Sequence, residues 1–205
     1  MTRVRPTWAR LAVGVLAIGV SCATGFQRPS LSSLTLGQTT KESVLRTYGN
    51  PERTRDGFQN DQPITSLEYV SATRHITGQI ELKVYSFAFV EDRLVGFSFA
   101  STSPGEQRDL SPTATSEIKK GTTTKAQVLA RFGQPSSAWL YPAMLEDDAE
   151  EGDSALQYVS VVPAPVMGAP MTTKTLRITF NAKDVVKGVG YTETGTTVQP
   201  VSHSR

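Results

Sequence analysis

The chain has 205 residues, of which 38% are hydrophobic and 20% are charged, a composition typical of a soluble globular protein. This composition excludes a disordered chain and a protein with several membrane spans. The formal net charge is +2, but Arg3, Arg5 and Arg10 lie in the first ten residues, and without them 18 basic residues (21 less 3) stand against 19 acidic ones. Because nucleic-acid affinity rests on clustered Lys and Arg, this balance argues against nucleic acid as a partner.

Residues 1–21 have the layout of a secretory signal, with basic residues followed by the uncharged run Leu11–Val20. That run is shorter than the roughly 20 apolar residues that cross a bilayer. The residues Ile18-Gly19-Val20-Ser21-Cys22 resemble the lipobox of bacterial lipoproteins. The resemblance implies cleavage before Cys22, attachment of lipid to its sulfur, and a lipidated tether over residues 22–31. It also implies, through Ala23, an outer-membrane location facing the periplasm.

Cys22 is the only cysteine of the chain, so it cannot form an internal disulfide. A lipid attachment point explains an unpaired thiol in an oxidising compartment, and several acyl chains give stable anchoring. Two alternatives remain open, namely an ordinary cleaved signal with a leftover thiol and an uncleaved amphiphilic anchor.

Two segments after the tether repeat one another at a fixed offset. Both contain Gly, Thr-Thr-Lys, Val-Leu, an aromatic residue and Gly-x-Pro, in residues 36–51 and again in residues 120–135. Each copy predicts a short helix that begins at a threonine cap and ends at a glycine before a proline. In the first copy Thr39 and Glu42 have the spacing of a capping box, and in the second copy Thr124 and Gln127 do. Such short helices need tertiary packing, so Val44, Leu45, Val128 and Leu129 are expected to face a core.

Alternating apolar residues after each helix predict an extended segment followed by a hairpin. The hairpins are expected over residues 79–100 and 174–192, and in the first one the alternation is interrupted near Tyr85. Residues 101–115 and the tail from residue 194 are rich in Ser, Thr, Pro and Gly, and are predicted to be a linker and a flexible end.

The order of these motifs resembles the SmpA/OmlA (BamE-like) domain family, and two tandem copies resemble the β-lactamase inhibitor protein. The resemblance implies an α+β fold of two tandem modules, over residues 32–100 and 116–193. Each module would pack short helices on one face of its own antiparallel sheet.

Residues for catalysis are sparse. The only histidines are His75 and His203, too few for a metal site or a catalytic triad, so we expect no enzyme, no metal and no cofactor. The acidic run over residues 146–153 is interpreted as a solvated insertion, with a cation site as the weaker alternative. A carboxylate-dependent enzyme is the remaining catalytic hypothesis, with candidate carboxylates Asp56, Asp61, Glu68 and Glu91.

Two apolar stretches are candidate contact surfaces. One includes Trp139 and Tyr141, and the other includes Val162, Val166 and Met167 in a proline-rich segment. The alternatives are core packing for the first stretch and a loop folded over its own sheet for the second.

The sequence thus predicts an envelope-anchored lipoprotein that binds a protein partner without catalysis, in outer-membrane assembly or maintenance. It indicates no small-molecule substrate. An inhibitor of a secreted hydrolase is the first alternative.

Overall fold

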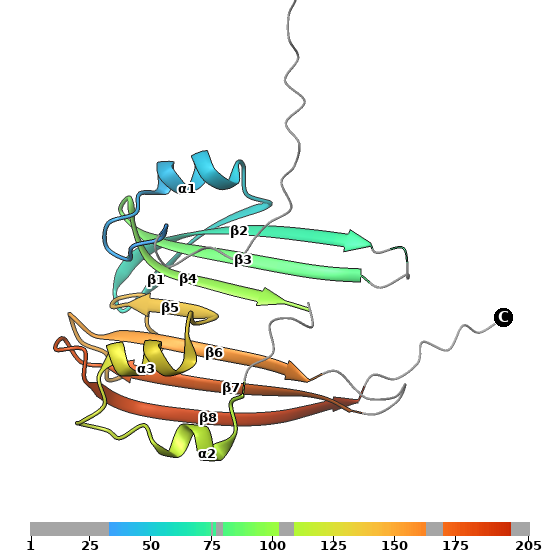
Figure 1. Cartoon of the computed structure of the whole chain (residues 1–205). Helices are drawn as coiled ribbons and strands as arrows, with labels where there is room; N and C mark the ends of the chain where they lie inside the picture. Colours follow the sequence, from blue (N-terminus) through green and yellow to red (C-terminus); the bar gives the residue numbers. More distant parts are fainter. Residues whose placement is uncertain (1–32, 75, 77–79, 103–108, 163–169, 198–205) are drawn as a thin grey trace, which may run out of the picture.

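The computed structural model describes residues 33–74, 76, 80–102, 109–162 and 170–197. Within this part of the chain, no helix is long and apolar enough to cross a membrane. Short helices and long strands follow one another in this order (Figure 1): α1 Lys41–Tyr48, β1 Arg53–Gln59, β2 Gln62–Arg74, β3 Ile80–Val90, β4 Arg93–Ser101, α2 Pro112–Ser116, α3 Lys125–Phe132, β5 Ser137–Leu140, β6 Ser154–Val162, β7 Pro170–Phe180 and β8 Val186–Thr197.

All eight strands form one antiparallel sheet in sequence order, so the prediction of two tandem modules is wrong. The join lies between β4 and β5, where Gly96 pairs with Trp139 and Phe97 with Ala138. The physical reason is that a separate first module would leave the edge of β4 unpaired, and an exposed edge invites pairing. Short β5 meets that edge, and the sheet continues into the second half.

One hydrophobic core lies under the helices and spans both halves. It contains Val44 of α1 and Val128 of α3, each 1% exposed, together with one set of alternating residues from the strands. We call the sheet surface that packs on these helices the helix face and the opposite surface the open face. Leu45 and Leu129 also pack against the core, as their predicted positions require.

The two helices are held in the same way. Gly37 and Gly121, 84 residues apart, donate backbone hydrogen bonds to Leu94 and Val186. Gly49 and Gly133 end the helices, with φ of 78° and 70°, in a backbone region that favours glycine.

The capping predictions had different outcomes. The box of Thr124 with Gln127 is confirmed, because each side chain accepts a hydrogen bond from the other residue's backbone N–H. The box of Thr39 with Glu42 is wrong, because the helix begins one residue later and Thr40 accepts from the N–H of Ser43. The hydroxyl of Thr39 instead accepts from the N–H of Thr35, which fixes the loop before the helix.

Part of the predicted linker packs on the protein. Leu110 is 1% exposed and belongs to the core, and the five-residue helix α2 follows it. This segment crosses the second half near β8 (Figure 1).

The sheet has two different ends (Figure 1). The loop end carries the connections β1–β2, β3–β4, β5–β6 and β7–β8, and the hairpin end carries the connections β2–β3 and β6–β7. On β3 the apolar pattern changes face between these ends. Tyr85, Phe87 and Phe89 are fully buried on the helix face, whereas Ile80 and Leu82, on the open face, are 66% and 39% exposed. The interruption near Tyr85 is this change of face, because the β2–β3 pairing runs through it without a shift.

Candidate functional site

The connection between β5 and β6, residues 141–153, folds over the open face at the loop end. Its residues Ala143 and Met144 are buried at 5% and 1% exposure. Ala143 packs in a second, smaller core cluster with Ile64 and Val95, whose side chains come from β2 and β4. The connection therefore covers this part of the open face and forms a defined surface above it.

The β1–β2 turn is hydrogen-bonded to this connection. Asn60 and Asp61 have φ of 47° and 60°, as expected of a two-residue hairpin turn. The side-chain amide of Gln59 donates to the carbonyl of Met144 at 2.6 Å, and that of Asn60 donates to the carbonyl of Pro142 at 2.8 Å. Two loops that are distant in sequence thus form one unit, which we call the loop ridge (residues 58–60 and 142–145).

Two large apolar side chains are exposed beside the joint of the loop ridge. They belong to different faces of the sheet, because Phe58 pairs with Pro63 at a helix-face position and Leu145 lies on the connection over the open face. Phe58 is 82% exposed and Leu145 is 72% exposed. Each neighbours a residue of the hydrogen-bonded joint, since Phe58 precedes Gln59 and Leu145 follows Met144. Exposed apolar surface on a fixed backbone is a candidate contact site for a protein partner.

Arg177, on the open face of β7, ties the connection to the sheet. Its guanidinium forms a two-point ion pair with Glu146, with Nη2 2.9 Å from Oε2 and a short contact between Nε and Oε1. It also lies 4.5 Å from the ring centroid of Trp139, within the range of a cation–π contact. Trp139 in turn lies directly over Gly96, where an added Cβ would come within 2.5 Å of its ring. These residues form a stack from β4 to β7.

The ion pair with Arg177 lowers the pKa of Glu146, because the guanidinium donates hydrogen bonds to the charged form of the carboxylate. Both side chains are mostly covered, with 20% and 23% exposure for Arg177 and Glu146. The carboxylate is therefore held charged and paired.

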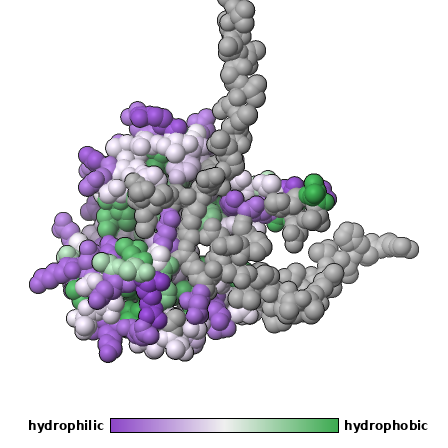
Figure 2. Space-filling view, viewed as in Figure 1, coloured by the Kyte–Doolittle hydropathy of each residue, from purple (hydrophilic) through white to green (hydrophobic). Residues whose placement is uncertain are grey.

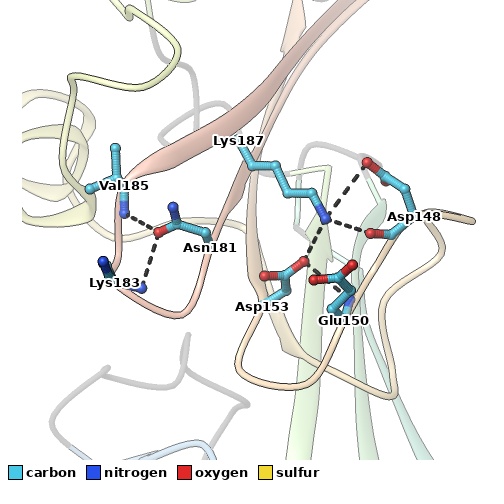
Figure 3. Close-up of polar contacts among 7 residues, drawn as sticks. All are labelled: Asp148, Glu150, Asp153, Asn181, Lys183, Val185 and Lys187. Atoms are coloured by element: carbon cyan, nitrogen blue, oxygen red, sulfur yellow. Dashed lines mark hydrogen bonds and ion pairs between the residues drawn. The ribbon is translucent and has the colours of Figure 1, made fainter.

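Lys187, on β8, holds the other end of the connection (Figure 3). Its Nζ is 2.8 Å from Oδ2 of Asp153 and also donates to the backbone carbonyl of Asp148. The hydrogen bond to Asp153 raises the pKa of Lys187, since it favours the charged ammonium. Asp153 is only 4% exposed and closes the loop by accepting from the N–H of Glu150.

The acidic run is therefore only partly a solvated insertion. Its exposed members are Asp147, Asp148, Glu150 and Glu151. The two that bracket them, Glu146 and Asp153, are paired with Arg177 and Lys187. Among the described residues, no group of three or more His, Cys, Asp and Glu side chains is placed to hold a metal ion.

The carboxylates considered for acid–base chemistry lie apart or have other partners. Asp56 accepts a hydrogen bond from Thr65 at 2.7 Å, and Glu68 lies 3.6 Å from Arg55. Asp61 and Glu91 occupy turns, both with positive φ.

Of the predicted contact residues, Trp139 and Tyr141 are half-buried, at the end of β5 and the start of the connection. Trp139 supports the loop ridge from beneath. Val162 ends β6, and nothing is described of its side chain. Cys22, Val166 and Met167 lie outside the described residues.

Sequence reasoning missed Arg177, Gly96 and Phe58. Arg177 is an isolated charge in an alternating strand, which looks like any solvent-facing position, and its partner Glu146 is 31 residues away. The glycine within the β4 pattern was an available signal, because a glycine inside a strand often marks the close approach of another group.

A shallow cavity of about 240 Å³ lies on the helix side, beside α3, and Glu117, Ile118, Arg131 and Phe132 are among its lining residues. The corresponding cavity beside α1 is lined by the residues at the same offset of 84 and measures about 30 Å³. This pair of hollows is a trace of the sequence repeat within the single sheet.

No family model matches the chain, and no curated protein matches it. The comparisons thus lend no support to membership of the SmpA/OmlA family. Among solved structures, the chain is similar to one from Streptococcus mutans described as a "putative beta-lactamase inhibitor protein". The TM-score is 0.49 and the sequence identity 12%, over 79% of this chain and 92% of that chain.

Proposed function

We propose that the protein is a non-enzymatic binding protein of the cell envelope, and that the loop ridge is the surface that holds its protein partner. One observation carries the proposal: Leu145 is exposed on a loop whose backbone is hydrogen-bonded to the β1–β2 turn and packed on the sheet. A surface that is already ordered loses little conformational entropy on binding, so its apolar contacts contribute more fully to affinity.

The supports of the ridge fit binding better than catalysis. Arg177 and Lys187 neutralise the two covered carboxylates of the connection, Glu146 and Asp153. A general acid or base needs a carboxyl group that can gain or release a proton near the operating pH. The lowered pKa of Glu146 moves that group away from such a role.

Anchoring is the second part of the proposal, and it rests on Cys22 and the signal-like segment before it. Lipidation would confine the ridge to a membrane surface and raise the effective concentration of any partner there. Replacing Cys22 by alanine is expected to release the protein from the membrane fraction of cells, and unchanged retention would contradict lipidation.

Site-specific crosslinking tests the binding surface. A photoreactive residue is placed at Leu145 in the intact chain in cells, and a matched one is placed at Val189, which is 41% exposed on β8. We expect a crosslinked protein of defined mass from position 145 and not from position 189. Equal products at both positions, or none at 145 while the chain is folded, would overturn the assignment of the ridge.

The identity of the crosslinked protein then decides between partner classes. A component of outer-membrane assembly or maintenance would agree with the leading hypothesis. A secreted hydrolase would favour the inhibitor alternative, in which case the intact chain should inhibit that enzyme stoichiometrically and Leu145→Asp should abolish the inhibition.

A further inference from the structure

We propose that the hairpin end of the sheet is a membrane-contacting tip that rests on the lipid surface through Ile76, Ile80 and Leu82. This inference goes beyond the proposed binding function and shares with it only the envelope location. The loop ridge and the tip lie at opposite ends of the sheet, so each can be tested without the other.

The first observation is the exposure of aliphatic side chains at this end. Ile76 is fully exposed at 106%, Ile80 at 66% and Leu82 at 39%. Figure 2 shows hydrophobic surface at the tip of the β2–β3 arm, which projects from the body of the molecule. Exposed apolar groups gathered at a projecting tip are placed to enter the boundary between headgroups and acyl chains.

The second observation is that the pattern is built into the strands. The register pairs Leu82 with Ala72 and Val84 with Val70, so apolar residues face one another on the open face. The helix-face positions at the same level are Ser71 and Lys83. A solvent-facing end would carry polar residues on the open face, as antiparallel sheets commonly do.

The third observation is the charge at this end. Arg74 pairs in register with Ile80 and lies on the same face of the hairpin. The nearby carboxylate, Glu81, forms an ion pair with Lys83 at 2.9 Å, and Glu193 on β8, at the same end of the sheet, lies 3.9 Å from Lys174. A basic residue beside the apolar tip, with the nearby carboxylate neutralised, fits the anionic headgroups of a lipid surface.

The tether also allows this contact. The tether joins the described part of the chain at Ser33, and two contacts locate this residue relative to β3. Ser33 lines the same small cavity as Tyr48, and the ring of Tyr48 lies 6.0 Å from that of Tyr85 on β3. From Tyr85 to Ile80 the strand advances five residues, about 17 Å. The ten residues between Cys22 and Ser33 extend to about 35 Å at most, so a lipid at Cys22 and the tip can reach one membrane together. Contact at the tip would direct the loop ridge away from the membrane.

Tryptophan fluorescence tests the proposal. The intact chain is purified from membranes and reconstituted in vesicles of phosphatidylethanolamine and phosphatidylglycerol, with brominated acyl chains as quenchers. Ile80→Trp is compared with Leu145→Trp at the other end, and the signal of the parent chain is subtracted. We expect the tryptophan at position 80 to emit at shorter wavelength and to be quenched, and the one at position 145 to remain unquenched.

Each outcome bears on one proposal. An unquenched, long-wavelength tryptophan at position 80 in a folded protein would overturn the membrane tip, as would a crosslink from position 80 to a partner protein. Equal quenching at positions 80 and 145 would also overturn it, since the molecule would then lack the stated orientation. Failure of Leu145 to crosslink a partner affects only the binding surface. Ile80→Asp checks the energetics, because an aspartate at the tip should lower the fraction of tips inserted in the lipid by roughly tenfold. This loss is read as weaker quenching of a Leu82→Trp reporter.

Discussion

Replacing Arg177 by methionine should destabilise the protein by about 2–3 kcal/mol at neutral pH. The change removes two charge-assisted hydrogen bonds to Glu146, each contributing roughly 1.5–3 kcal/mol, and leaves a covered carboxylate without its partner. Removal of one partner from a fully buried pair costs roughly 3–5 kcal/mol. The expected value lies below that range because both side chains keep about a fifth of their surface exposed.

Urea denaturation at equilibrium measures this effect, with Arg46→Met as the matched control. Arg46 also forms an ion pair with a glutamate, Glu42 at 2.9 Å, but both side chains are more than 70% exposed. The control should therefore change the free energy of unfolding by less than about 0.5 kcal/mol. A double-mutant cycle of Arg177→Met with Glu146→Gln should show coupling of about 1–2 kcal/mol.

The loss should also depend on pH. The folded-state pKa of Glu146 is lowered below its ordinary value of 4.5, so the pair stabilises the fold above that pH. The contribution disappears as the pH falls through the lower folded-state pKa. The difference between the parent chain and Arg177→Met should therefore be full at pH 7 and shrink below about pH 4. A loss equal to that of the exposed control, or one that grows in acid, would refute the reasoning.

Two further changes test the sheet itself. Gly96→Ala should destabilise the protein by about 1–3 kcal/mol and shift the fluorescence of Trp139, since the new Cβ would lie 2.5 Å from that ring. The control Gly57→Ala, whose new Cβ would have no atom within 4 Å, should be neutral or slightly stabilising. Equal losses of stability in the two variants would contradict the stack. Val44→Ala and Val128→Ala should each cost about 2 kcal/mol and shift one common unfolding transition, because both residues lie in one core. Two separable transitions by calorimetry would mean that the halves fold independently.

The local elements follow from the sequence because their causes are local. The cap at Thr124 and the glycine stops at residues 49 and 133 depend on neighbours within a few positions, so short-range patterns predict them. The helical spacing of apolar residues likewise predicts that Val44 and Val128 face a core, although distant strands supply that core. The interruption near Tyr85 was also visible in the sequence, but its meaning was not. The alternation of apolar residues shows only that the pattern changes near Tyr85. The β2–β3 register shows that the strand continues through this point and that the apolar residues move to the other face of the sheet.

How the two repeats combine depends on contacts between distant segments. Two copies of one pattern are compatible with two modules or with one sheet, and the difference lies in the short pairing of β4 with β5, which involves residues about 40 positions apart. The pairing of Arg177 with Glu146 and the joint of Asn60 with Pro142 are likewise long-range contacts that no local pattern encodes. Local patterns are enough to predict which residues prefer helix, strand and core. The pairing of the β4 and β5 edges and the ion pair of Arg177 with Glu146 depend on where the folded chain brings distant segments together. Local patterns therefore cannot predict them.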